Sequence, residues 1–117
     1  MGASRNFKVT NKDGGITADQ MYKNRAKIQL NVRNDHRDVM ETLERISGDP
    51  NAMVTVYKVT TGPGLKHGDW VYISRNQALK KLNGTNGQRR QGVKLVSAMV
   101  YAEDLVWSRK NLEFLYI

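Results

Sequence analysis

The chain has 117 residues and a formal net charge of +8, with a sequence pI near 9.9. It contains no cysteine, which excludes disulfide frameworks, thiolate nucleophiles and cysteine-based zinc sites. Apolar residues at 39% and charged residues at 26% are typical of a soluble globular protein, so we expect one domain over residues 1–117. No stretch approaches the roughly 18 apolar residues of a spanning helix, so we expect no membrane segment.

The excess of basic residues has two interpretations. Residues 61–117 hold nine basic and four acidic side chains, whereas residues 1–60 hold ten and seven. Such a charge keeps a small protein soluble, and it also attracts polyanions. The second interpretation predicts a partner with phosphates, either a nucleic acid or a nucleotide.

The first half of the chain predicts two short strands and two helices. Phe7 to Thr10 and the alternating segment Lys27–Val32 favour strands. Thr17 can cap a short helix that runs to Asn24. A second helix is the clearest element of the chain, because its apolar residues fall on one stripe and Gly48 follows as a stop. That stripe consists of Val39, Met40, Leu43 and Ile46, and Asn34 or Asp35 can cap the helix start.

The second half is dominated by strands. Residues 53–59, 70–74, 93–101 and 112–117 are predicted strands, residues 77–82 a short helix, residues 83–92 a polar loop and residues 103–105 a turn. Helices that come early and strands that come late indicate an α+β domain with a mostly antiparallel sheet.

Three polar side chains lie within or at the end of these apolar strands: Lys58, Ser74 and Glu113. Burying such groups singly is costly unless they are paired or functional. The pattern therefore leaves two alternatives, a structural hydrogen-bonded network and a functional site. The two histidines, His36 and His67, have no neighbouring ligand at metal-binding spacing, so we expect no metal site.

Four motifs from residue 54 to the C-terminus occur in an informative order. They are Val56-Tyr57-Lys58, Gly68-Asp69-Trp70-Val71-Tyr72-Ile73-Ser74, Val100-Tyr101-Ala102-Glu103-Asp104-Leu105-Val106-Trp107 and Glu113-Phe114-Leu115-Tyr116. In order and spacing they resemble the ADP-ribosyltransferase-like domain attached to phage minor head proteins and found in mobile elements. The resemblance covers residues 54–117, just over half of the chain.

The resemblance implies a split pair of small sheets with NAD bound in the cleft between them. It implies a mono-ADP-ribosyltransferase that moves ADP-ribose from NAD, its substrate, to a protein or nucleic acid in the cytoplasm of a bacterial host. Glu113 would be the catalytic carboxylate, which stabilises the positive charge on the sugar as nicotinamide leaves. The residues implied in NAD binding are Tyr57, Lys58, Trp70, Tyr72 and Ser74.

Two departures from the family keep an alternative open. Lys58 stands where the family mostly has Arg, and a Lys lacks the planar two-pronged donor. Asn111, two residues before Glu113, replaces the Glu or Gln that many members use to orient the acceptor. The alternative is a catalytically inactive module on the same fold that binds RNA or DNA through phosphate contacts. Its basic residues would be Arg75, Lys80, Lys81, Arg89 and Arg90. A third interpretation, a phage structural or assembly protein, rests only on where the resembling domains occur.

Overall fold

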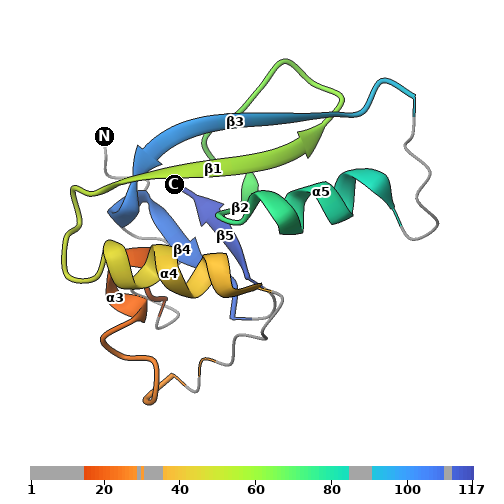
Figure 1. Cartoon of the computed structure of the whole chain (residues 1–117). Helices are drawn as coiled ribbons and strands as arrows, with labels where there is room; N and C mark the ends of the chain where they lie inside the picture. Colours follow the sequence, from red (N-terminus) through yellow and green to blue (C-terminus); the bar gives the residue numbers. More distant parts are fainter. Residues whose placement is uncertain (1–14, 29, 31–35, 85–90, 110–111) are drawn as a thin grey trace.

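Two long strands, β1 (Met53–Thr60) and β3 (Lys94–Tyr101), form the longest element pair of the computed structural model (Figure 1). The structure describes residues 15–28, 30, 36–84, 91–109 and 112–117. β1 and β3 run antiparallel and pair along their whole lengths, from Met53 opposite Tyr101 to Thr60 opposite Lys94. Val54 and Val56 of β1 are buried, whereas Met53 is exposed, so one face of this pair turns to the core.

Three short strands complete the sheet: β2 (Trp70–Tyr72), β4 (Leu105–Trp107) and β5 (Glu113–Tyr116). The order is β3-β1-β2-β5-β4, and every neighbouring pair is antiparallel. The predicted α+β class with an antiparallel sheet is confirmed. The expected separation into two sheets is not seen, because the described strands form one sheet. Its long β1–β3 part and its short β2–β5–β4 part meet at one residue pair, Tyr57 opposite Tyr72.

The strongest predicted helix is present as α4 (Arg37–Arg45), and its N-cap residue is His36. Val39, Leu43 and the following Ile46 are fully buried, as their helical spacing requires. Gly48 has φ of 77°, a left-handed conformation that suits glycine just beyond a helix. The stop predicted at this glycine is therefore confirmed.

The described residues contain two further α-helices. The short α3 (Ala18–Met21) begins at Thr17, whose backbone N–H donates to the Gln20 side chain at 3.1 Å. α5 (Arg75–Asn83) follows β2 and runs along β1 and β3 (Figure 1). It is longer than the predicted helix at residues 77–82, because Ser74 caps its start.

The main core lies between α3, α4 and one face of the sheet. It unites Met21 and Leu43 of the helices with strand residues such as Val56, Val71 and Phe114, all at most 1% exposed. Burial of side chains of this size contributes about 1.5–3 kcal/mol each. This cluster fixes which face of each strand is covered, and so decides which polar strand residues remain on the other face.

Some predicted elements of the first half differ or lie outside the described residues. The strand predicted at residues 27–32 is wrong where the structure describes it. The Ile28 N–H donates to the Asn24 carbonyl at 3.0 Å, a turn hydrogen bond that ladder pairing would not allow. The helix predicted from Thr17 to Asn24 ends at Met21 and continues as turns. Phe7–Thr10, Asn34 and Asp35 lie outside the described residues.

The remaining difference is β4, a strand that the sequence analysis did not predict after the turn expected at residues 103–105. A 3-10 turn, η2 (Ala102–Asp104), is present, but Leu105 then starts a strand paired with β5. Within the described ranges, no helix has the length and apolar character needed to cross a bilayer.

Candidate functional site

Three of the predicted site residues form one row across the sheet. Tyr57 of β1 lies opposite Tyr72 of β2, and Tyr72 lies opposite Glu113 of β5. Residues directly opposite each other in a sheet project to the same face. Trp70 and Leu115, two residues further along their strands and also opposite each other, share that face. We call these five residues the Glu113 face.

Tyr72 of β2 and Glu113 of β5 lie opposite each other, so the Tyr72 phenol and the Glu113 carboxylate are neighbours on the sheet. Desolvation of the phenol, the nearby Glu113 charge and hydrogen bonding to that carboxylate raise the pKa of Tyr72 to about 12. Tyr72 therefore stays protonated at neutral pH and keeps donating to Glu113. The pair places a protonated phenol beside the Glu113 carboxylate on a partly exposed surface.

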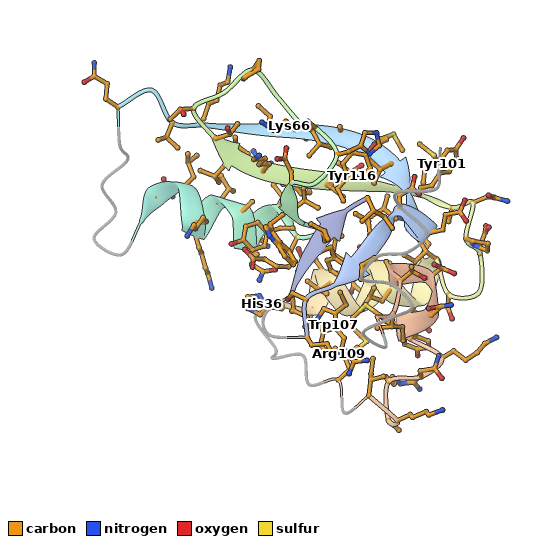
Figure 2. All side chains as sticks on the ribbon, turned by 180° about the vertical axis from the view of Figure 1, so that it is seen from behind. His36, Lys66, Tyr101, Trp107, Arg109 and Tyr116 are labelled. Carbon is orange, nitrogen blue, oxygen red and sulfur yellow. The ribbon has the colours of Figure 1, made fainter. Side chains whose placement is uncertain are left out.

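A small cavity lies beside this pair. Its volume is about 190 Å³, and it opens between β2, β4 and β5. Its lining includes Trp70, Val106, Trp107, Ser108, Arg109 and Leu115. Figure 2 shows Trp107 and Arg109 close together at the end of β4.

The cavity and Glu113 are adjacent along the strands. Leu115 is two residues from Glu113 on the same face, a step of roughly 7 Å. Ser108 donates its backbone N–H to the Glu113 carbonyl at 3.0 Å. Trp70 is 50% exposed and also lines the cavity. The Glu113 face thus combines a carboxylate beside a phenol, a half-exposed aromatic residue and a ring-sized hollow.

Lys58 lies on the opposite face of the sheet from this row, because it follows Tyr57 directly along β1. Its Nζ lies 2.6 Å from Asp69 Oδ1, with the Lys58 side chain 21% exposed and that of Asp69 8% exposed. Asp69 also accepts the Lys66 backbone N–H at 2.8 Å. Burial alone would raise the pKa of the Asp69 carboxyl, but the Lys58 and Lys66 contacts outweigh it and lower that pKa. The structure therefore gives Lys58 an internal partner, away from Glu113.

The loop before β2 is also fastened to the end of β5. The His67 ring stacks on Tyr116 with ring centres 4.5 Å apart, and His67 Nδ1 lies 3.0 Å from the Ile117 oxygen. Gly68 donates to the Tyr116 carbonyl, and Tyr116 donates back to the Asp69 carbonyl. Lys66 and Tyr116 mark this region in Figure 2. Gly68 and Asp69, which precede β2, therefore hold this loop against the end of β5 through their backbone hydrogen bonds to Tyr116.

Ser74 is fully buried at the junction of β2 and α5. Its Oγ accepts the Gln77 backbone N–H at 3.1 Å, which caps the helix. The same hydroxyl donates to Asp38 Oδ2 of α4 at 2.7 Å. Ser74 therefore joins α5 to α4, and its predicted contact with an NAD ribose stays a prediction.

The predicted basic residues are divided between described and undescribed segments. Arg75, Lys80 and Lys81 are exposed on α5. Arg89 and Arg90 lie outside the described residues. Over the part that the structure describes, no group of three or more His, Cys, Asp or Glu side chains is placed to hold a metal ion.

Sequence reasoning missed three residues that shape the site. Asp38 and Asp69 were assigned no role, although each binds a predicted site residue. Arg109 also went unnoticed. It has φ of 69°, a conformation uncommon for a non-glycine residue and frequent where geometry is held for function. The only sequence signal was the Gly68-Asp69 pair itself, since the other contacts join distant segments.

Comparisons with protein-family models, curated proteins and solved structures give no match to this chain. The resemblance drawn from the ordered motifs consequently stays a prediction.

Proposed function

We propose that the Glu113 face binds NAD and that the chain transfers ADP-ribose from it to a macromolecule. One observation carries this proposal: the Tyr72–Glu113 pair lies on the same face as the exposed Trp70 and beside the ring-sized cavity. A carboxylate, an aromatic surface and a small hollow are the features that a glycosyl transfer from a ring leaving group requires.

The reaction breaks the bond between the ribose C1′ and nicotinamide, which leaves with the bonding electrons, while an acceptor nucleophile bonds to C1′ and releases its proton to solvent. Glu113 stabilises the positive charge that develops on the sugar. Tyr72 holds the carboxylate in place, so that little reorganisation is needed as this charge develops. Catalysis therefore rests on Glu113, with Tyr72 as its positioning residue.

The cavity fits one ring rather than a whole dinucleotide. Pockets for drug-sized ligands usually measure about 300–1,000 Å³, which exceeds the 190 Å³ beside Trp70. Trp70 and Leu115 offer apolar contacts to such a ring, and the rest of the substrate lies along the exposed surface. Lys58 and Ser74 support the strands and helix that carry the site. In keeping with the resemblance, we place the protein in a bacterial host's cytoplasm and among phage or mobile-element proteins.

The test uses NAD labelled in its adenosine part, incubated with separate protein, RNA and DNA pools. We expect label in one pool and a rise in melting temperature on adding NAD. Glu113→Gln keeps an acceptor for the Tyr72 hydroxyl but removes the charge, so transfer should fall about 10²- to 10³-fold. NAD affinity should change little, because this contact acts mainly in the transition state.

The matched control is Glu41→Gln, the same change at an exposed position of α4. It should leave transfer unchanged. The proposal fails if the unmodified protein shows neither label transfer nor an NAD-dependent melting shift.

A second candidate is the basic nucleic-acid-binding module, and one observation favours it. Lys58, the cation expected to bind NAD phosphates, is already paired with Asp69. Arg75, Lys80 and Lys81 are exposed on α5, and this helix surface would make the phosphate contacts. Binding to single-stranded RNA should weaken steeply with salt, and each lost phosphate contact should reduce the slope by about 0.7. Lys81→Gln should therefore flatten the salt dependence, while Lys23→Gln on an exposed turn should not.

A further inference from the structure

The two edges of the sheet differ in whether other described residues pair with them. At the β4 edge, Thr17 forms a bridge with Val106, and the Trp107 N–H donates to the Ile16 carbonyl at 2.9 Å. At the other edge, β3 pairs with β1, and no other described residue pairs with it. An uncovered edge offers a row of backbone donors and acceptors to another strand.

The hydrogen bonds between β3 and β1 show which residues of β3 have backbone groups that point away from β1. The Ala102 N–H donates to the Ala52 carbonyl at 2.8 Å, in the same register that pairs Tyr101 with Met53. Backbone groups alternate along a strand in the direction they point. Lys94, Val96, Ala98 and Val100 therefore bond to β1, whereas the backbone groups of the four residues that alternate with them point outward. Those four residues are Leu95, Ser97, Met99 and Tyr101.

The residues of β3 itself lack the features that usually prevent edge pairing. The strand is eight residues long and contains no proline, and its single charge, Lys94, is at one end. Apolar side chains flank it on one face: Met99 is 60% exposed, Tyr101 49% and Met53, the β1 partner of Tyr101, 38%. Tyr101 lies at the margin of the molecule in Figure 2. A partner that pairs with this edge would cover those side chains.

We propose that β3 pairs antiparallel with β3 of a second copy of this chain, across a two-fold axis at Ala98. An antiparallel edge is complementary to itself under two-fold symmetry, so the same residues serve both copies. This register uses all four outward-pointing residues on each side. It sets Met99 against Ser97 of the second copy and Tyr101 against Leu95, so each large side chain meets a smaller one. The sheet then continues from one copy into the other.

Register is tested by cysteine cross-linking, which is clean because the chain has no native cysteine. In the proposed register the two Ala98 residues form a non-hydrogen-bonded pair, with Cα atoms about 4.5 Å apart. That separation suits a disulfide, whereas Ser97 and its copy lie diagonally, about 7–8 Å apart, beyond the usual range. We expect the Ala98→Cys variant to form a covalent dimer under mild oxidation and Ser97→Cys to form about tenfold less at equal time. Equal or dominant linkage through Ser97→Cys would overturn the Ala98 register.

Association itself is tested by sedimentation velocity over a concentration series. An edge contact buries less than a standard interface of about 1,200–2,000 Å², so the dimer should be weak and concentration-dependent. Met99→Lys places a charge on the edge and should reduce the association constant at least tenfold. Thr61→Lys, an equal charge change on the exposed loop after β1, should leave it within twofold. A monomer at all concentrations, or equal weakening by both variants, overturns the proposal.

Discussion

Lys58 Nζ lies 2.6 Å from Asp69 Oδ1, and this contact ties the end of β1 to the loop that leads into β2. The two residues come from motifs that the sequence places in one candidate site. Their ion pair gives Lys58 a structural role, because it neutralises the buried Asp69 carboxylate.

Replacing Lys58 by Met should destabilise the fold. The change leaves the buried Asp69 carboxylate without its cation, which we expect to cost about 1–3 kcal/mol, below the figure for fully buried pairs because Lys58 is partly exposed. Urea denaturation measures the loss. In a double-mutant cycle with Asp69→Asn, the coupling energy should be about 1 kcal/mol. Lys66→Met is the matched control, because Lys66 donates to Asp69 through its backbone N–H and its side-chain charge is the smallest cause of the lowered Asp69 pKa. Equal stability of Lys58→Met and the unmodified protein would contradict the structural role.

Asp69 should also shape stability in acid. Its folded-state pKa is lowered below 3.8, so it contributes stability above pH 3.8 that is lost as pH falls through the folded value. Asp69→Asn removes this contribution at all pH values. The difference in unfolding free energy between the two proteins should therefore be constant above about pH 5 and shrink below pH 3.8. A difference that stays constant through the acid range would show that Asp69 is not stabilised as a carboxylate.

Tyr72 should titrate late in an alkaline titration. Its folded pKa of about 12 is raised from 10.0, so the protonated form stabilises the fold below pH 10 and this contribution is lost as pH rises towards 12. Tyrosinate absorbance of the unmodified protein minus that of Tyr72→Phe isolates this group. Glu113→Gln should lower the midpoint towards 10.0 without reaching it, because burial is the largest cause of the shift. A midpoint near 10.0 in the unmodified protein would contradict the Tyr72–Glu113 pair.

Ser74→Ala should destabilise the junction between α4 and α5. The variant loses the cap to Gln77 and the hydrogen bond to Asp38, together about 1–3 kcal/mol. Amide exchange of the first turn of α5 should quicken more than that of β3. Ser97→Ala, at an exposed serine of β3, should stay within about 0.5 kcal/mol of the unmodified protein. If Ser74→Ala abolishes NAD binding but leaves stability and exchange unchanged, Ser74 acts on the ligand and not on the fold.

The elements that the sequence predicts well are those with a local signal. β1 and α4 carry their apolar period within themselves, β3 is a run of mostly apolar residues, and Gly48 ends the helix through its own conformational freedom. β4 has three residues, which are too few to show an alternation of apolar and polar side chains. It is a strand because it pairs with β5. The segment from Lys27 alternates like a strand, but the hydrogen bond from Ile28 to Asn24 keeps it in turns.

The candidate site was predictable only in part, for a similar reason. Alternation along β2 places Trp70 with Tyr72, but the register that sets Tyr72 opposite both Tyr57 and Glu113 joins three distant segments. Shifting that register by one residue would bring Lys58 to the Glu113 face instead. The 36-residue separation between Asp38 and Ser74 likewise hides their hydrogen bond from any local pattern.

The pairing of β1 with β3 also bears on how fast the protein folds. Its nearest contact, Thr60 with Lys94, closes a chain segment that contains all of β2 and α5. Such closure costs chain entropy before the ladder forms, and sheets built from distant strands fold in roughly milliseconds to seconds. We therefore expect the refolding rate to be set by this ladder, with α4 forming its local contacts earlier.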